Sequence, residues 1–294
     1  MNTVEVFSPA KLNLLLAILG RREDGFHELL SVATPLQWGD RLVAEAVDSD
    51  ELTLFCDDPE VPVDDGNLVL RAARVFRAVT GWPGGVRFAL EKYIPMGAGL
   101  GGGSSNAVAA LRALNELAGG PLGEPAVTGL AAGIGSDCAL FVPGGPVAMR
   151  GRGERLSVLP AGPAERLRGR RVLVFKPGFP ISTAWAYARL AASGKYWAAE
   201  MAEAWLGSWL ASEAPAEELL GNNMEAAAFA KYPALPVLLD QLRADFGLAP
   251  RMSGSGSACF ALLPEHGGPA IAELRAAIAD AWGPHALVVE TRLA

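Results

Sequence analysis

The most informative stretch of the chain reads Pro95-Met96-Gly97-Ala98-Gly99-Leu100-Gly101-Gly102-Gly103-Ser104-Ser105-Asn106. Its glycines, five in seven positions, leave backbone amides uncovered just before a helix that the apolar spacing predicts over residues 104–118. A helix N-terminus carries roughly half a positive charge, and amides that converge there bind phosphate oxygens. Ser104 and Ser105 would add hydroxyl donors or cap the helix. The stretch therefore predicts a phosphate-binding loop, whose glycines are Gly97, Gly99, Gly101, Gly102 and Gly103.

Other interpretations of this loop fit less well. Gly97, Gly99 and Gly102 satisfy the G-x-G-x-x-G pattern, but a dinucleotide site also needs an acidic residue about 20 positions later. At that distance, residues 115–117 still lie in the predicted helix. A Walker A loop needs lysine where Gly103 stands. A tight turn that only packs a helix on a sheet rarely needs so many glycines, so phosphate binding remains favoured.

The pattern of apolar residues predicts a β-rich first third and an α+β second half. Alternation and helical spacing favour strands over 3–7, 11–19 and 86–92, a strand pair formed by 41–46 and 51–56, and a helix over 67–80. Residues 160–171 are polar and basic and include proline, which is typical of a linker. We therefore expect an N-terminal domain over residues 1–160, with the phosphate loop, and a C-terminal domain over residues 171–294.

Composition and charge restrict the class of protein. Of the 294 residues, 51% are hydrophobic and 19% are charged, which excludes a disordered or fibrous chain. The net charge of −7 and the scattered basic residues argue against a nucleic-acid partner. Three distant cysteines, expected to be buried thiols, fit a reducing compartment. No apolar run is long enough to cross a bilayer and no targeting pattern occurs, so we expect a cytoplasmic protein without a membrane partner.

Two further segments mix polar and apolar residues. Ser8-Pro9-Ala10-Lys11-Leu12-Asn13 puts a lysine in an apolar stretch, where a buried amine would need an anion nearby. A lysine that reaches the surface from a strand edge fits these residues equally well. Met252-Ser253-Gly254-Ser255-Gly256-Ser257 could be a flexible turn or a ligand loop. The three histidines lack a metal-binding spacing and no G-x-S-x-G elbow occurs, so phosphoryl transfer is the best fit.

These segments, together with Arg22-Glu23-Asp24-Gly25-Phe26-His27 and Gly135-Ser136-Asp137, occur in the order and spacing of the GHMP small-molecule kinases. The chain resembles that family over essentially its whole length, and most closely the branch that acts on a cytidyl diphosphate-linked polyol in isoprenoid synthesis. The resemblance implies an N-terminal α/β domain, a C-terminal ferredoxin-like α+β domain and an active site in the cleft between them. It also implies transfer of the ATP γ-phosphoryl group to a small-molecule hydroxyl group in the presence of Mg²⁺. The metal ligands stay unassigned, and we expect a monomer or a homodimer.

The resemblance also implies roles for individual residues. Asp137 would be the catalytic base, and Lys11 would be the amine beside it and the transferring phosphate. His27 would read the cytosine edge, Phe26 and Tyr187 would stack on the two faces of the base, and Asn13 would hold the substrate. Besides the five loop glycines, the implied ATP-binding positions are Asn67, Lys92, Ser104, Ser105, Gly254, Ser255 and Gly256.

Three positions depart from the family pattern. Phe26 stands where tyrosine is common, so the stacking face is kept and a hydroxyl is lost. Cys138-Ala139 stand where Val-Pro usually follows the base, and Asn223 stands where aspartate is common. Asp137 itself is kept, so the chemistry is retained.

Alternative functions come from three classes. The nearest is another GHMP kinase, acting on homoserine, mevalonate or a sugar, and the cytosine-site residues Phe26, His27 and Tyr187 argue against it. A non-catalytic nucleotide-binding protein would not need both Lys11 and Asp137. A dinucleotide oxidoreductase lacks its ribose-binding acid.

Overall fold

The computed structural model describes residues 2–294, which form two compact units. The first unit comprises the chain up to Lys11, Trp38–Met96 and Gly101–Gly144, and the second comprises Leu12–Gln37, Gly97–Leu100 and Gly145–Ala294. The expected domains over residues 1–160 and 171–294 stay a prediction. None of the helices within residues 2–294 is long and apolar enough to cross a membrane.

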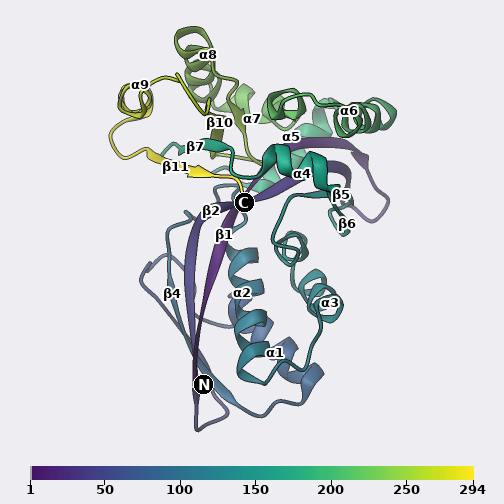
Figure 1. Cartoon of the computed structure of the whole chain (residues 1–294), viewed down its shortest axis with the longest axis vertical. Coiled ribbons are helices and arrows are strands. Elements are labelled where there is room, and N and C mark those ends of the chain that lie inside the picture. Colours follow the sequence, from purple (N-terminus) through teal and green to yellow (C-terminus); the bar gives the residue numbers. More distant parts are fainter. Residues whose placement is uncertain (1) are drawn as a thin grey trace. The chain divides into compact units, whose positions relative to one another are not determined.

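The first unit is built on a sheet with the strand order β3-β4-β2-β1, and Figure 1 shows helices on one face of it. The strands are β1 Thr3–Arg21, β2 His27–Val47, β3 Leu52–Cys56 and β4 Gly85–Glu91, of which β1 and β2 continue into the second unit. On β4, Phe88 and Leu90 are buried while Arg87 and Glu91 are exposed. This alternation is typical of a sheet that is covered on one face.

Strand β1 is longer than the sequence predicted. The two expected strands over 3–7 and 11–19 are a single strand of 19 residues that passes through Pro9. Gly39 on β2 allows this passage, because a Cβ atom there would lie 2.1 Å from the carbonyl oxygen of Ser8 and 2.6 Å from the Cα of Pro9. Glycine at position 39 therefore lets the two backbones approach each other closely.

The expected strand pair formed by 41–46 and 51–56 is wrong. Strand β4 lies between them, with Ala89 opposite Val43 in the antiparallel pair with β2 and opposite Phe55 in the parallel pair with β3. The chain between β3 and β4 forms helix α1 (Leu68–Thr80), and parallel neighbours need such a crossover connection. A short sequence window shows two adjacent strands but not the later strand that inserts between them.

Helices α1, α2 (Gly102–Leu117) and α3 (Glu124–Ile134) pack against one another in the first unit. The side chain of Asn67 caps α1 by accepting a hydrogen bond from the backbone N–H of Val69, and Gly81 ends the helix with φ at 69°. Helix α2 confirms the helix expected over 104–118, and Leu111 and Leu114 are fully buried on it. These helices give the first unit its α/β character.

The second unit contains two sets of strands. In one set, β1 pairs with β8, and β2 pairs with β5, which also pairs with β6. The other set is a four-stranded antiparallel sheet with the order β11-β7-β10-β9. The strands that belong to the second unit are β5 Val147–Gly151, β6 Arg155–Val158, β7 Arg171–Lys176, β8 Gly221–Asn222, β9 Arg251–Met252, β10 Cys259–Leu262 and β11 Leu287–Arg292.

Within residues 2–294, six α-helices complete the second unit and make it α+β, as the sequence predicted. They are α4 Ala161–Leu167, α5 Thr183–Ser193, α6 Ala199–Ala211, α7 Glu225–Lys231, α8 Ala234–Phe246 and α9 Ile271–Trp282. Helix α4, which has seven residues, occupies most of the segment expected to be a linker, and Ala164 and Leu167 on it are buried. The segment 160–171 is therefore not irregular.

The cysteines differ in burial. Cys138 and Cys259 are buried, as expected, whereas Cys56 is only partly buried. Burial raises the pKa of the Cys138 thiol to about 11. This thiol is therefore protonated and unreactive at neutral pH, although it directly follows Asp137 in sequence.

Candidate active site

The ammonium of Lys11 and the carboxylate of Asp137 lie together in the first unit. Lys11 is on β1 and Asp137 follows α3, with 3.9 Å between Nζ and Oδ2. The side chain of Lys11 is 4% exposed and that of Asp137 is 42% exposed. Burial lowers the pKa of Lys11, and the negative charge of Asp137 opposes this shift. The prediction of a buried amine beside an anion is thus confirmed, and the alternative of a surface lysine is wrong.

The glycine-rich loop leads directly into the N-terminus of α2. Gly101 is the N-cap residue, with φ at 73°, and as a glycine it has no side chain with which to cap the amides of the first turn. A Cβ atom on Gly101 would lie 2.9 Å from Cζ of Phe141 and 3.0 Å from Cγ of Lys11. Glycine is therefore required both by the backbone conformation and by the close passage of Lys11. The helix N-terminus and the ammonium together offer positive charge to a phosphate group.

The two serines of the loop differ in position. Ser105 is 1% exposed, and its hydroxyl oxygen accepts a hydrogen bond of 2.9 Å from the hydroxyl of Ser8. Ser104 and Gly102 are half-buried, and Gly103 is exposed. Ser105 thus stabilises the packing of α2, whereas Ser104 is better placed to meet a ligand.

Asn67 and Lys92 have protein partners in the structure. Oδ1 of Asn67 accepts a hydrogen bond of 2.9 Å from the N–H of Val69, and Nδ2 donates one of 2.6 Å to the carbonyl of Pro62. The side chain of Lys92 is 6% exposed, and its ammonium is paired with the carboxylate of Asp40. Both side chains therefore have structural roles, and their contact with ATP stays a prediction.

Aromatic rings gather around His27 in the second unit. The centroid of its imidazole ring is 4.9 Å from that of Tyr187 on α5 and 6.1 Å from that of Tyr196. Within residues 2–294, Nε2 of His27 is buried and has no hydrogen-bond partner. Burial and then the charge of Arg21 lower the pKa of His27, which favours the neutral ring. A neutral imidazole can both donate and accept, as recognition of a polar base edge requires.

Phe26 has a basic side chain over its ring. The ring is 48% exposed, and the guanidinium carbon of Arg152 lies 4.8 Å from its centroid. The structure therefore pairs Phe26 with Arg152 and Tyr187 with His27. Stacking of a base between Phe26 and Tyr187 stays a prediction.

Asn13 follows Lys11 by two residues on β1 and is 6% exposed. Its Nδ2 donates a hydrogen bond of 2.9 Å to the hydroxyl of Ser31. Its backbone N–H donates one of 3.2 Å to the hydroxyl of Ser253. The amide side chain is thus fixed in place by the second unit, and its role towards a substrate is a prediction.

The segment Met252–Ser257, which includes the predicted Gly254, Ser255 and Gly256, is held by the first half of the glycine-rich loop. The hydroxyl of Ser253 donates to the carbonyl of Gly99 at 3.2 Å, and a Cβ atom on Gly99 would lie 2.5 Å from the carbonyl oxygen of Ser253. Nδ2 of Asn222 donates two hydrogen bonds of 2.8 Å to carbonyl groups of the segment. These contacts argue against a flexible turn.

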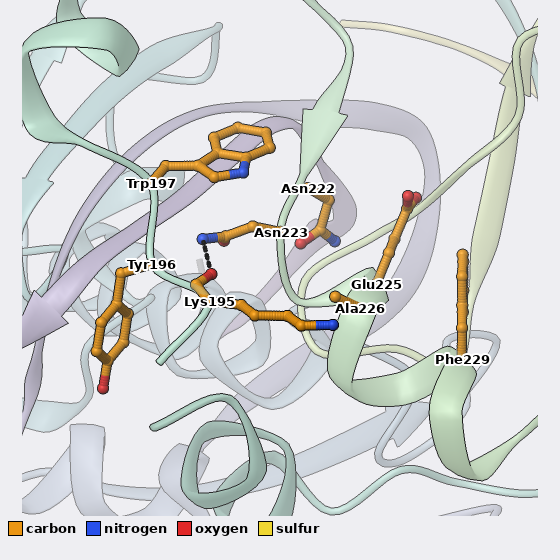
Figure 2. A pocket seen from close by; sticks show the side chains of 8 residues that line it. All are labelled: Lys195, Tyr196, Trp197, Asn222, Asn223, Glu225, Ala226 and Phe229. Carbon is orange, nitrogen blue, oxygen red and sulfur yellow. Dashed lines mark hydrogen bonds between the residues drawn. The ribbon is translucent and has the colours of Figure 1, made fainter. Parts of the chain in front are cut away.

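A pocket of about 480 Å³ lies in the second unit, and Figure 2 shows the side chains that line it. Tyr196 and Trp197 lie on one side of it, and Glu225 and Phe229 on the other. Burial raises the pKa of Glu225, whose carboxylate accepts a hydrogen bond of 2.9 Å from the N–H of Met252. The pocket is lined by Lys195, Tyr196, Trp197, Asn222, Asn223, Glu225, Ala226 and Phe229, so it contains none of the predicted site residues.

Comparisons with known proteins decide the family. Two family models match the chain: GHMP kinases N terminal domain over residues 67–148 and GHMP kinases C terminal over residues 206–280. The chain is also 38% identical to a 4-diphosphocytidyl-2-C-methyl-D-erythritol kinase of Chlorobium phaeobacteroides (strain BS1), over 90% of its own length and 91% of that protein. The chain belongs to the GHMP kinase family.

Solved structures agree with this assignment. A crystal structure of 4-(cytidine 5'-diphospho)-2C-methyl-D-erythritol kinase matches this GHMP kinase with a TM-score of 0.76 at 36% identity, covering 99% of this chain and 100% of that chain. A homoserine kinase from Cytophaga hutchinsonii gives a TM-score of 0.75 at 18% identity, covering 100% of this chain and 95% of that one, which shows a shared fold. The two-domain GHMP kinase fold expected from the sequence is thus confirmed.

The structure explains one departure of this GHMP kinase from the family pattern. Oδ1 of Asn223 accepts a hydrogen bond of 2.9 Å from the N–H of Ile18, and Nδ2 donates one of 2.8 Å to the carbonyl of the same residue. An aspartate could make the first bond but not the second. Asparagine therefore satisfies both backbone groups of Ile18. Nothing in the structure explains Cys138-Ala139 in place of Val-Pro.

Sequence reasoning missed several residues that contact the predicted site residues in this kinase. Tyr196 and Arg152 lie beside His27 and Phe26, and Ser253 bonds to Asn13. Asp40, beside Lys92, had no distinguishing signal, because β2 also carries Glu28, Arg41 and Glu45. Such an acid must find several donors when it is buried.

Proposed function

We propose that this GHMP kinase transfers the γ-phosphoryl group of ATP to the 2-hydroxyl of 4-diphosphocytidyl-2-C-methyl-D-erythritol, a step of the non-mevalonate isoprenoid pathway. The observation that carries the proposal is the Lys11–Asp137 pair, 3.9 Å apart, next to Gly101 at the N-terminus of α2. The relative from Chlorobium phaeobacteroides, which carries the name of this activity, supports the choice of substrate.

Asp137 would act as the general base. As the substrate oxygen forms a bond to the γ-phosphorus, the bond from that phosphorus to the bridging oxygen of ADP breaks, and the hydroxyl proton passes to the Asp137 carboxylate. The exposed fraction of this carboxylate, 42%, leaves it open to a substrate. General-base assistance of this kind typically contributes 10²–10⁴-fold to the rate.

Lys11 and the amides of α2 would hold the transferring group. Phosphoryl transfer depends mainly on positioning and on stabilising negative charge. The carbon chain of Lys11 passes close to Gly101 and the side chain is 4% exposed, so its ammonium would need little reorganisation during the reaction. Asp137 favours the charged form of Lys11, because its carboxylate raises the pKa of Lys11, which burial lowers.

The cytosine base would be recognised in the second unit. His27, with a buried and unsatisfied Nε2, would bind its polar edge, and Phe26 and Tyr187 would stack on its faces. Asn13 would hold the polar part of the substrate. Phe26 lacks the hydroxyl of a tyrosine, and the guanidinium carbon of Arg152 lies 4.8 Å from its ring centroid.

We further propose that Mg²⁺ accompanies ATP. Within residues 2–294 no three His, Cys, Asp or Glu side chains gather as a metal site. A magnesium ion usually keeps several water ligands and binds through substrate phosphates with one or two carboxylates, and the partly exposed Asp137 would be one such carboxylate. When bound, the ion would neutralise charge on the phosphates. The expected cytoplasmic location and monomeric or homodimeric state stay predictions.

The test is ADP release by the purified chain with ATP, magnesium and a panel of alcohols. We expect release with 4-diphosphocytidyl-2-C-methyl-D-erythritol and little with homoserine, mevalonate or a sugar. Product mass should show one added phosphoryl group. Release with mevalonate or homoserine, and none with the cytidyl substrate, would overturn the proposal.

A further inference from the structure

A buried carboxylate below the phosphate loop has no assigned role. Asp40 on β2 is fully buried and accepts four hydrogen bonds within the first unit. Oδ1 accepts from the backbone N–H groups of Tyr93 and Ile94, both at 2.8 Å. Oδ2 accepts from Nδ2 of Asn106 at 2.9 Å and from the ammonium of Lys92. A buried charge is tolerated only when it is satisfied in this way.

These donors come from the two ends of the loop. Lys92, Tyr93 and Ile94 directly follow β4 and precede the loop, whereas Asn106 lies in the first two turns of α2. Asp40 therefore ties the chain that enters the loop to the helix that leaves it. Four bonds converge on one side chain, so its removal would affect both ends together.

Ile94 and Lys92, which both bond to Asp40, also lie directly against Gly102. A Cβ atom on Gly102 would lie 3.0 Å from Cγ2 of Ile94 and 3.2 Å from the ammonium nitrogen of Lys92. Both groups are positioned by Asp40. The location of the Gly102 backbone, and of the amides around it, thus depends on atoms that Asp40 holds.

A second set of hydrogen bonds extends the network to β1. The Nδ2 of Asn106 also donates to the hydroxyl of Ser8 at 2.8 Å, and this hydroxyl donates to that of Ser105 at 2.9 Å. Ser8 is three residues before Lys11 on the same strand. The network therefore connects the first turn of α2 with the strand that carries Lys11.

We propose that Asp40 is a positioning residue for phosphate binding, which acts by fixing the backbone around Gly102 and the ammonium of Lys92. The proposal rests on the proposed function only in taking ATP as the ligand of the loop. Because Asp40 is fully buried, it would act through the position of the first amides of α2 and not by contact with ATP or the acceptor. Its loss should weaken ATP binding more than it affects the acceptor.

Asp40→Asn changes the network in a defined way. One amide oxygen can still accept from the N–H groups of Tyr93 and Ile94. The amide nitrogen would then face the ammonium of Lys92 and Nδ2 of Asn106, which are both donors. Lys92 would also remain buried without a counter-charge, so the groups that lie against Gly102 should shift.

The experiment measures ATP binding by calorimetry and steady-state kinetics on the full chain. We expect Asp40→Asn to raise the Kd and the KM for ATP about tenfold, while the KM for the acceptor stays within about twofold. Asp48→Asn, which changes the same residue type at an exposed position, is the matched control and should match the parent. A folded Asp40→Asn protein that binds ATP like the parent, with only its melting temperature lowered, would overturn the proposal.

Asn106→Ala serves where Asp40→Asn does not fold. It removes one donor to Asp40, the bond to Ser8 and the acceptor of a 3.3 Å hydrogen bond from the Lys92 ammonium. The Lys92–Asp40 pair itself stays in place, and the Kd for ATP should rise several-fold. An unchanged Kd would equally count against Asp40. If the parent binds ATP but phosphorylates none of the cytidyl substrate, the proposed acceptor is wrong, and the Asp40 comparison is still decided by ATP binding.

Discussion

Replacing Asp137 by asparagine keeps the shape of the side chain and removes its charge and its basicity. Two unit charges 3.9 Å apart interact by about 1 kcal/mol in water and about 4 kcal/mol at an effective dielectric constant of 20. Because the Asp137 side chain is 42% exposed, the lower end of this range applies. The loss of the general base adds a factor of roughly 10² or more in rate. We therefore expect kcat to fall at least about 10²-fold.

Binding of ATP should be largely kept in Asp137→Asn, because the amides at the start of α2 do not depend on this carboxylate. The pH profile should change as well. Asp137 raises the pKa of Lys11 against the lowering by burial, so its removal lets that pKa fall further. On the alkaline side of the pH profile, the residual activity of Asp137→Asn should therefore begin to fall at a lower pH than that of the parent, because the Lys11 ammonium loses its proton earlier.

The assay is ADP release across pH on parent, Asp137→Asn, Lys11→Met and the double variant. The fall in kcat of the double variant should be smaller than the product of the two single falls, because the effects of residues that act as a unit are not additive. Asp48→Asn, at an exposed position, is the control for a change of net charge. Turnover within a few-fold of the parent by a folded Asp137→Asn protein would remove Asp137 from the mechanism.

Three further results are expected. Tyr187→Ala should raise the KM of the cytidyl substrate at least several-fold and leave the KM of ATP unchanged, since base–aromatic stacking is worth about 1–3 kcal/mol; an unchanged substrate KM would make Tyr187 a packing residue. Gly101→Ala should lower kcat far more than Gly81→Ala. Both glycines have φ near 70°, but only at position 101 would the added Cβ atom crowd Lys11. Equal kcat values for the two variants would contradict this reasoning. The pKa of His27 in the folded protein lies below its ordinary 6.5. As the pH falls below 6.5, the unfolded chain therefore takes up a proton at His27 before the folded protein does, and the free energy of unfolding falls. Denaturant titrations should show a weaker pH dependence for His27→Gln than for the parent.

Local patterns fixed much of the first unit. The stop signal at Gly81 and the cap at Asn67 lie at the ends of one helix, and both are visible in a window of a few residues. The glycines before residue 104 are required by a left-handed N-cap and by a close approach, which the sequence indicated through composition. Local patterns did not predict the pairing of β3, because its partner β4 is separated from it in sequence by the whole of helix α1.

The site divides in the same way. The sequence alone identified Lys11 as an amine in an apolar strand and the glycine-rich loop as a phosphate site, since both follow from residue types within one segment. It could not choose between a surface and a buried Lys11, nor distinguish Asp137 from the other acids without the family resemblance. Both questions depend on the Asp137 carboxylate, which is more than 120 residues from Lys11 in the chain. Only the packing of α3 and β1 places this carboxylate 3.9 Å from the ammonium. Asp40 was likewise hidden, because its donors lie in the segment that follows β4 and in α2, and only the folded structure brings them to one carboxylate.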